Sequence, residues 1–343
     1  MMSVFEQYKK FPPSRYMGSK NKIIKNLHNV FKDIKFNSAI DLFSGSGSVS
    51  YLLKSMGKKV ISNDYMHFSA NISKSIIENS KTKLEKIDII KLLEKPKKYD
   101  KFVQKKFKDI FYWDADNDFI DIVRNNIKNL KNPYKKNIAL AALTKACQKK
   151  QPRGIFTFIS DRYGDGRADL KKSFEAQFVE AINIFNESIF DNNKKNESLN
   201  KDFLSVKNKA DLIYIDPPYF SKHSDNEYVR RYHFVEGLVR NWEGVDIQET
   251  SKVKKFKKYP SMFDTEEGSQ KAIDMLIKRY SKSKIVMSYS SNSLPTLNKI
   301  KDIVEINKRT INVKKVNYTY SFGTQKKGKE IKNSVQEYII LID

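Results

Sequence analysis

The stretch AIDLFSGSGSVSY at 39–51 limits the fold of this chain more than any other part of its sequence. Residues 36–43 have the pattern of a short strand, and the glycines that follow open a turn into a helix. A second strand, KKVISND at 58–64, ends in an acid. The order strand, glycine turn, helix, strand predicts an α/β protein with a parallel sheet, in which ligands bind at the carboxyl ends of the strands.

The pattern of the sequence changes after the second strand. From about residue 75 to 195 helical periodicity dominates, with two apolar stripes that we expect to face a core. The stripes are Ile138, Leu140, Ala142, Leu143 and Ala146, and Phe174, Phe178, Ala181, Ile182 and Phe185. We therefore predict that residues 75–195 form an inserted, mostly helical subdomain, and that residues 1–74 and 196–343 form the domain that contains the sheet.

The α/β pattern resumes beyond the insertion. The predicted strands are 211–215, 284–290, roughly 303–321 and 335–342, and the predicted helices are 232–241 and 268–281. The last two strands could form a hairpin that closes the sheet, joined by the Gly/Lys-rich segment FGTQKKGKE.

The chain carries a net charge of +25, from 65 Lys and Arg residues against 40 Asp and Glu. A protein this basic attracts polyanions, nucleic acid above all, through phosphate contacts and the release of counterions. The alternative is that an AT-rich genome, bacterial, phage or similar, has enriched lysine throughout, since the lysines are scattered along the chain. The composition favours nucleic-acid binding.

The number of cysteines, the spacing of the histidines and the hydropathy narrow the class of protein further. The single Cys147 excludes an internal disulfide and a cysteine-based zinc site, and the four histidines lack the spacing of metal ligands, so we expect no metal. The sequence has neither a signal-like start nor an apolar window of the length that a membrane span needs. These features predict a cytoplasmic setting.

Two glycines shape the first candidate site. Gly45 and Gly47 permit a tight turn close to a ligand, and the following helix offers free N–H groups to an anion. Asp41 places an acid before the turn, suited to a ligand ammonium. The pattern is DLFxGxG rather than GxGxxG, because position 50 is Ser, and this disfavours a dinucleotide. Asp64, at the end of the second strand, is suited to ribose hydroxyls; a surface acid or a helix cap is the alternative.

A second candidate site follows the apolar strand within LIYIDPPYFSK at 212–222. Pro217 and Pro218 donate no N–H and stiffen the backbone, so its carbonyl oxygens stay free as acceptors. Together with the Asp216 carboxylate, such a carbonyl can hold an amino group, and Tyr219 offers a flat face for a base. The string indicates a site for an exocyclic amino group on a planar heterocycle; a Pro-rich turn is the plainer alternative.

Three motifs together resemble those of the DNA adenine-N6 methyltransferases of the DNA adenine methylase family. They are RYMGSKNKI at 15–23, DLFSGSG at 41–47 and DPPY at 216–219, in the order of the alpha group of amino-methyltransferases. The resemblance extends over most of the chain, about 12–342. It implies a Rossmann-like methyltransferase fold, S-adenosyl-L-methionine as methyl donor, and a target-recognition domain at the place of the helical insertion.

The resemblance also implies roles for the matching residues. Tyr16 and Lys20 would line the pocket of S-adenosylmethionine, and Asp64 would hold its ribose. In the stretch NKDFLSV, Asp202 would bond the adenine of the cofactor and Phe203 would flank it. The residues that would cradle the methionine part are Asp41, Phe43, Gly45 and Gly47. The segments SYSSNS and VNYTYSFG resemble two further family motifs more loosely.

The implied reaction is site-specific methylation of adenine N6 in double-stranded DNA. The target base would be flipped out of the duplex, Asp216 and the Pro217 carbonyl would accept from its amino group, and the nitrogen would attack the methyl in line. No covalent enzyme intermediate is needed. A monomer is expected, and a cognate restriction endonuclease could accompany the enzyme without being physically required.

Three arginines in the turn-rich part of the insertion are candidates for DNA binding: Arg153, Arg162 and Arg167. Arginine is the best reader of guanine edges in the major groove. Phosphate contacts, or ion pairs with neighbouring aspartates, are the alternative. Residues 220–231, directly after DPPY, are expected to form a loop that closes over the flipped base, or else a plain solvated loop.

Other functions compete with this one. Methylation of cytosine N4, of RNA adenine or of a protein glutamine uses a similar amino-group pocket, but Asp at the first position of DPPY and the basic insertion favour adenine in DNA. A non-catalytic DNA-binding relative would carry a broken motif, and both motifs are intact. A nicotinamide-dependent oxidoreductase would need the third glycine.

Overall fold

The computed structural model describes residues 2–159, 166–221, 227–320 and 333–343, with a seven-stranded sheet in the order β3-β2-β1-β4-β5-β7-β6. The strands are β1 (Ser38–Asp41), β2 (Lys59–Asn63), β3 (Glu197–Leu199), β4 (Leu212–Ile215), β5 (Lys284–Ser290), β6 (Ile311–Tyr320) and β7 (Asn333–Ile342). Neighbours from β3 to β5 are parallel, whereas β7 is antiparallel to both β5 and β6. This is the α/β, Rossmann-like architecture that the sequence predicts.

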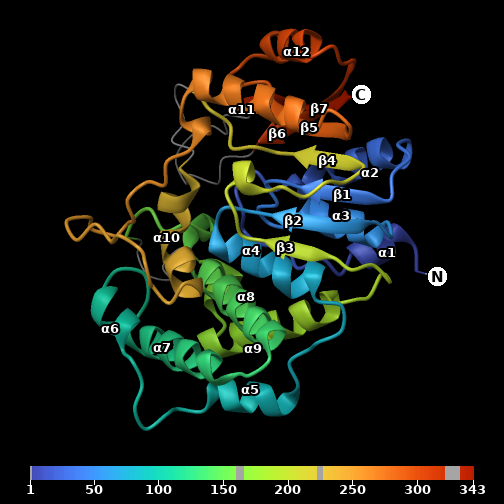
Figure 1. Cartoon of the computed structure of the whole chain (residues 1–343). Coiled ribbons are helices and arrows are strands. Elements are labelled where there is room, and N and C mark those ends of the chain that lie inside the picture. Colours follow the sequence, from blue (N-terminus) through green and yellow to red (C-terminus); the bar gives the residue numbers. More distant parts are fainter. Residues whose placement is uncertain (1, 160–165, 222–226, 321–332) are drawn as a thin grey trace.

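Helices cover both faces of the sheet (Figure 1). On one face lie α11 (Glu266–Arg279) and α12 (Leu297–Ile306). The other face is covered by α1 (Val4–Tyr8), α2 (Ile24–Lys32), α3 (Ser48–Ser55) and α4 (His67–Ser73). The apolar run of β4 follows from this arrangement, because Leu212 and Tyr214 pack into one core and Ile213 and Ile215 into the other.

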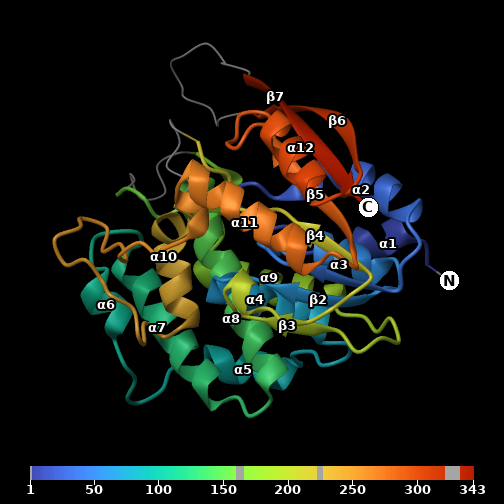
Figure 2. The same ribbon diagram turned by 45° about the horizontal axis from the view of Figure 1, so that its top comes forward.

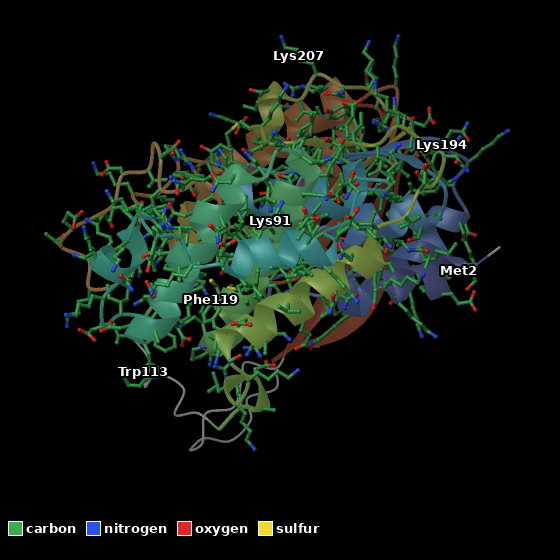
Figure 3. All side chains as sticks on the ribbon, turned by 90° about the horizontal axis from the view of Figure 1, so that it is seen from below. Met2, Lys91, Trp113, Phe119, Lys194 and Lys207 are labelled. Atoms are coloured by element: carbon green, nitrogen blue, oxygen red, sulfur yellow. The ribbon has the colours of Figure 1, made fainter. Side chains whose placement is uncertain are left out.

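The chain between β2 and β3 is mostly helical. After α4, which continues as a π-helical turn (Lys74–Glu78), the helices are α5 (Lys86–Leu93), α6 (Phe102–Lys106), α7 (Asp114–Asn129), α8 (Pro133–Lys150) and α9 (Phe174–Ser188). The two predicted apolar stripes are buried on α8 and α9, except for Leu140, which is partly buried. Figure 3 looks onto this helical layer, on which Lys91, Trp113 and Phe119 are labelled. Its core is continuous with that of α1 to α4.

Helix α10 (Tyr228–Val239) contacts both the helical layer and the sheet domain. Nε2 of His233 donates to the carbonyl of Phe156 at 2.8 Å, and the N–H of Phe156 donates to the carbonyl of Arg231 at 2.8 Å. From the same helix, the buried carboxylate of Glu236 accepts the N–H of Phe68 at 3.0 Å and so caps the first turn of α4. α10 therefore ties the helical layer to the segment that follows β2.

Gly237, in the middle of α10, provides a test of this packing. A Cβ at this position would lie 2.6 Å from Cδ1 of Trp242 and 2.8 Å from Cζ of Phe256. We expect Gly237→Ala to lower the free energy of unfolding by about 1–3 kcal/mol, because overpacking outweighs the gain in helix propensity of about 1 kcal/mol. Thermal unfolding followed by circular dichroism measures the change. Lys271→Ala, on the exposed side of α11, is the control and should shift the free energy by less than about 0.5 kcal/mol. A Gly237→Ala variant as stable as the wild type would contradict the prediction.

Two predicted elements are wrong in their extent. The loop expected at 220–231 ends earlier, because residues 228–231 form the first turn of α10, and residues 222–226 lie outside the described part of the chain. The strand expected at roughly 303–321 is formed only in its later part, as β6, and α12 occupies the first part. Thr296 caps this helix through its side chain, and Ile300, Ile303 and Val304 are buried on one helical face. β-Branched residues favour a strand here, but the cap and the spacing of three and four residues favour the helix that forms.

The remaining strands agree with the sequence to within a few residues. β6 and β7 form the predicted antiparallel hairpin, which Figure 2 shows beside β5. The predicted connector FGTQKKGKE lies outside the described residues. Among the helices that the structure describes, none has both the length and the apolar composition needed to cross a membrane.

The order of the strands reverses between β1 and β4, which lie side by side but lead to opposite halves of the sheet. Asp41 pairs in register with Tyr214, so that Asp41 and Asp216 both lie at the carboxyl edge. Open α/β sheets bind their ligands in the crevice at such a reversal. The turn with the two glycines follows β1, and DPPY follows β4, so both candidate sites lie at this crevice.

Candidate active site

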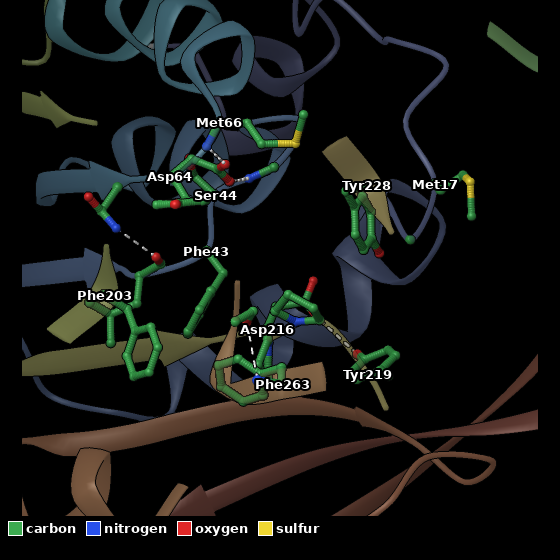
Figure 4. Close-up of a pocket in the computed structure, with 18 of the residues that line it drawn as sticks. Met17, Phe43, Ser44, Asp64, Met66, Phe203, Asp216, Tyr219, Tyr228 and Phe263 are labelled. Carbon is green, nitrogen blue, oxygen red and sulfur yellow. Dashed lines mark hydrogen bonds between the residues drawn. The ribbon is translucent and has the colours of Figure 1, made fainter. Parts of the chain in front are cut away.

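A cavity of about 400 Å³ opens at the carboxyl edge of the sheet. Its lining includes these residues predicted for catalysis or cofactor binding: Tyr16, Lys20, Asp41, Phe43, Gly45, Asp64, Asp202, Phe203, Asp216, Pro217, Pro218 and Tyr219. Figure 4 shows Asp64 and Phe203 on one side of the pocket and Asp216 and Tyr219 on the other. Segments distant in the sequence thus meet in one pocket, while the roles assigned to their residues stay predictions.

The turn after β1 requires its glycines. Gly45 and Gly47 have positive φ angles of 50° and 79°, and Gly47 is the N-cap of α3 rather than part of the lining. A Cβ on Gly45 would lie 2.8 Å from Cε1 of Tyr16. The backbone N–H of Gly45 donates to Oδ2 of Asp64 at 2.7 Å. The turn is therefore held from two sides, with the start of α3 directed toward the cavity through Ser48 and Val49.

Asp41 is a buried acid with an unused oxygen. Its exposed fraction is 1%, and its Oδ2 accepts the hydroxyl of Ser50 at 2.7 Å. Its Oδ1 is buried and accepts no hydrogen bond within the described part of the chain. Burial, together with the nearby charges of Asp216 and Asp64, raises the pKa of Asp41 to about 7. A cation that enters the cavity would satisfy the unused oxygen and favour the ionised carboxylate.

Asp64 holds backbone groups in place. Its Oδ2 accepts from Gly45, and its Oδ1 accepts from the N–H of Met66 at 2.9 Å. Burial raises the pKa of Asp64 to about 6. Each carboxylate oxygen has a second lone pair, so these bonds leave room for hydroxyl donors, and the predicted contact with a ribose stays a prediction.

Three phenylalanines form an aromatic wall of the cavity. The rings of Phe43 and Phe203 lie 5.4 Å apart, and the ring of Phe263 lies 5.5 Å from Phe43 and 5.4 Å from Phe203. Asp202 caps the short helix η5 (Phe203–Ser205) by accepting the N–H of Leu204 at 2.9 Å. Such a wall suits a flat heterocycle next to an acid.

The opposite side of the cavity carries the DPPY segment. Oδ1 of Asp216 accepts the hydroxyl of Tyr219 at 2.7 Å and lies 2.8 Å from Nζ of Lys20. Nζ of Lys20 also lies 3.3 Å from Oε1 of Glu337, on β7. The predicted cofactor residue Lys20 is thus placed at the predicted catalytic acid. The ring of Tyr16 is stacked on that of Tyr228, from α10, with 5.7 Å between ring centroids.

The residues of this site that the sequence does not predict include Phe263, Tyr228 and Glu337. Among these three, only Glu337 leaves a recognisable signal. It stands in the alternation Val335, Glu337, Ile339, where a strand that covers a core should carry apolar side chains. A single acid at such a position indicates a buried partner of opposite charge.

Of the three arginines predicted to bind DNA, two lie away from the cavity lining and one lies outside the described residues. Arg153 is exposed, and the part of the chain that the structure describes gives its side chain no hydrogen bond or ion pair. Nη1 of Arg167 donates to the carbonyls of Lys149 and Gln151, at 3.0 and 3.2 Å, and so satisfies the end of α8. Arg162 lies outside the described residues. Neither Arg153 nor Arg167 lines the cavity.

A family model described as D12 class N6 adenine-specific DNA methyltransferase matches residues 16–243, a range that includes both the glycine turn and DPPY. The chain is also similar to Type II methyltransferase M2.HphI of Haemophilus parahaemolyticus, with 26% identity across 97% of this chain and 98% of that protein. Two further relatives are Modification methylase StsI of Streptococcus sanguinis, 27% identical across 92% of this chain, and Modification methylase LlaI of Lactococcus lactis, 24% identical across 84%. The match covers 50% and 48% of these two proteins, so the chain spans about half their length.

Proposed function

Because the chain belongs to the D12 class of N6 adenine-specific DNA methyltransferases, we propose that it methylates adenine N6 at specific sites in duplex DNA, with S-adenosyl-L-methionine as the donor. The observation that carries this proposal is that Asp41 and Asp216 line one cavity from the ends of neighbouring strands. One carboxylate suits the ammonium of the donor and the other the amino group of the acceptor. The two reactants would therefore meet in a single site.

The residues on the glycine side fit S-adenosylmethionine. The unused Oδ1 of Asp41 is placed for the ammonium of its methionine part, and the start of α3 for its carboxylate. The space beside Gly45, which a side chain would fill, lets the ligand approach the backbone. Asp64 would hold the ribose, and Phe203 with Asp202 would take the adenine. When bound, the cofactor supplies an electrophilic sulfonium methyl group.

The DPPY side fits the acceptor. The Asp216 carboxylate and the Pro217 carbonyl accept the two hydrogens of the adenine amino group, and Tyr219 stacks on the ring. These bonds shift electron density onto the nitrogen and orient its lone pair toward the donor. Direct attack on the methyl follows, without a covalent bond to the protein, and positioning supplies much of the rate.

An adenine within a duplex cannot reach a cavity of this kind, so the base is flipped out, at a cost of a few kcal/mol. We assign the helical layer, residues 75–195, to recognition of the DNA around the target. The net charge of +25 supports binding to the phosphate backbone. We further propose that the chain acts as a monomer and that a restriction endonuclease of the same specificity is a functional rather than a physical partner.

The decisive experiment is transfer of a labelled methyl group from S-adenosylmethionine to duplex DNA of varied sequence, followed by digestion to nucleosides. We expect N6-methyldeoxyadenosine as the labelled product. Labelled N4-methyldeoxycytidine would show that the methyl group is transferred to the amino group of cytosine instead of adenine. No transfer to any DNA would overturn the proposal and direct the search to RNA or protein acceptors.

Arg153 allows a test of the assigned recognition layer. Arg153→Ala should weaken binding to duplex DNA but leave binding of S-adenosylmethionine unchanged, because its side chain is exposed and is not part of the cavity lining. A base contact should cost about 1–3 kcal/mol at the recognised sequence alone, whereas a phosphate contact should lower the salt slope by about 1 for all sequences. Fluorescence anisotropy at several salt concentrations separates the two. Lys282→Ala, an exposed charge next to β5, is the control for the loss of one cation. Equal losses in the two variants would contradict a DNA contact by Arg153.

A further inference from the structure

A buried cluster of charged groups lies beside DPPY and is not explained by the reaction as proposed. Lys20 is 5% exposed and Glu337 2%. Three acceptors among the described residues lie near the Lys20 ammonium, which has three N–H groups: Oδ1 of Asp216 at 2.8 Å, Oε1 of Glu337 at 3.3 Å and the carbonyl of Gly18 at 3.1 Å. One buried cation is therefore shared by two carboxylates.

Within the described residues, Lys20 and Tyr219 contact the same oxygen of the Asp216 carboxylate. Tyr219 donates to Oδ1 at 2.7 Å, the same oxygen that Lys20 contacts, and its hydroxyl lies 3.3 Å from Oε1 of Glu337. Within the residues that the structure describes, Oδ2 of Asp216 accepts no hydrogen bond. It is not among the side-chain atoms that are both fully buried and without a partner, so this oxygen is accessible. Asp216 lines the cavity, so Oδ2 is the oxygen available to an incoming amino group.

Glu337 occupies an inward position on the middle strand of the antiparallel half-sheet. It lies opposite Ser290 of β5 and Val316 of β6, on the face where Ile339 packs into the core. Burial raises the pKa of Glu337. A buried carboxylate costs several kcal/mol unless it is paired. Lys20 is that partner, and the pair joins the N-terminal segment to the C-terminal strand directly beside the proposed catalytic acid.

We propose that Lys20 and Glu337 are positioning residues for methyl transfer: the buried pair holds Oδ1 of Asp216, so that Oδ2 is presented to the amino group of the target base. The inference rests on the proposed role of Asp216. It places Lys20 on the acceptor side of the pocket rather than on the cofactor side that the family resemblance implies. Without the ammonium, two neighbouring carboxylates would compete for one proton.

A double-mutant cycle of Lys20→Met and Glu337→Gln tests the proposal through the single-turnover rate constant at saturating S-adenosylmethionine and DNA. Lys20→Met leaves two acids without their cation, and we expect a loss of about 100-fold at pH 7.5. Glu337→Gln keeps the pair of Lys20 with Asp216 and should lose no more than about tenfold. The double variant should be faster than Lys20→Met alone, within about tenfold of wild type, because the neutral amide removes the repulsion.

The pH–rate profile adds a readout that a purely structural role would not move. Within the described part of the chain, the titratable groups that face Asp216 are Lys20 before α2, Asp41 on β1, Tyr214 and Tyr219 on and after β4, Tyr228 on α10 and Glu337 on β7. Loss of the cation should shift the acid limb of the profile to higher pH, since the buried carboxylate cluster loses its stabilising charge. Loss of the Glu337 anion should shift that limb to lower pH.

Lys25→Met and Glu305→Gln make the same substitutions at exposed positions and should keep the wild-type rate. Binding of S-adenosylmethionine, by calorimetry, should stay within about threefold in all variants. Additive losses in the cycle would overturn the inference, as would weaker cofactor binding by Lys20→Met with a normal rate at saturation. If Lys20→Met does not fold, an unshifted acid limb in Glu337→Gln overturns it. A wild type without transfer to DNA would overturn the proposed function as well, whereas an active wild type with an additive cycle overturns the inference alone.

Discussion

Replacement of Asp216 by alanine should lower the single-turnover rate of methyl transfer to DNA by about 10³-fold or more, which corresponds to about 4 kcal/mol of transition-state stabilisation. The change removes the carboxylate that we propose as acceptor for the adenine amino group. The affinity for S-adenosylmethionine should stay within about threefold of wild type, because Asp41 and the glycine turn, which line the other part of the cavity, are untouched. The transfer rate of Asp216→Asn should lie between those of the wild type and Asp216→Ala, since the amide oxygen remains an acceptor but carries no charge.

The matched control for this variant is Asp246→Ala. Asp246 is an exposed acid outside the cavity lining that forms a surface ion pair with Lys257, and such pairs contribute little. Its loss should leave the rate of transfer unchanged. Quench-flow with tritiated methyl donor measures the rates, and isothermal titration calorimetry the affinities. Near-normal transfer by Asp216→Ala would remove the catalytic assignment.

The second large effect concerns the other carboxylate. Asp41→Asn should weaken binding of S-adenosylmethionine by about 30-fold, or about 2 kcal/mol, because an amide replaces the buried anion proposed to meet the ammonium. The control is a ligand: 5′-methylthioadenosine lacks the amino-acid part and should bind the variant and the wild type equally. Titration calorimetry with both ligands decides. An equal loss for both would show that the substitution disturbs the whole pocket rather than one contact.

The pH dependence of this binding follows from the burial of Asp41. Burial raises the pKa of Asp41 to about 7, and a cation binds the ionised form, which predominates above that value. Affinity should therefore fall about fivefold from pH 7 to pH 6, a window in which an α-amino group stays protonated. The Asp41→Asn variant should lose this dependence. A slope that persists in the variant would assign the titration to Asp64, whose pKa is raised to about 6.

The parallel half of the sheet is predictable because residues with a strong local conformational preference end its strands. Gly45 and Gly47 end the first strand, and the prolines after Asp216 end the fourth. Since parallel strands bring their carboxyl ends to one edge, a strand followed by a motif predicts where that motif lies. The prediction needs no long-range contact, and for this reason the sequence places the glycine turn and DPPY at one cavity.

The remainder depends on contacts between distant segments. Local sequence around Phe263 contains nothing that places its ring against Phe43. Lys20 is similar in sequence context to the other lysines of its segment, and only the fold brings it to Asp216. At 303–306, β-branched residues favour a strand, but a cap upstream and burial against the sheet decide for helix. Tertiary packing and charge pairing between distant residues override the intrinsic secondary-structure propensity of a segment.

The double attachment of α10 has a consequence for engineering specificity. A chimaera that exchanged residues 75–195 alone between relatives would replace Phe156 but keep Phe234 of α10, whose ring is stacked on that of Phe156 with 5.1 Å between the ring centroids. The smallest transplantable unit is therefore two stretches, the helical layer and α10, taken from one parent on either side of an unaltered β4 and DPPY. Swapped together, they would carry their mutual contacts with them and leave the catalytic segment of the recipient in place.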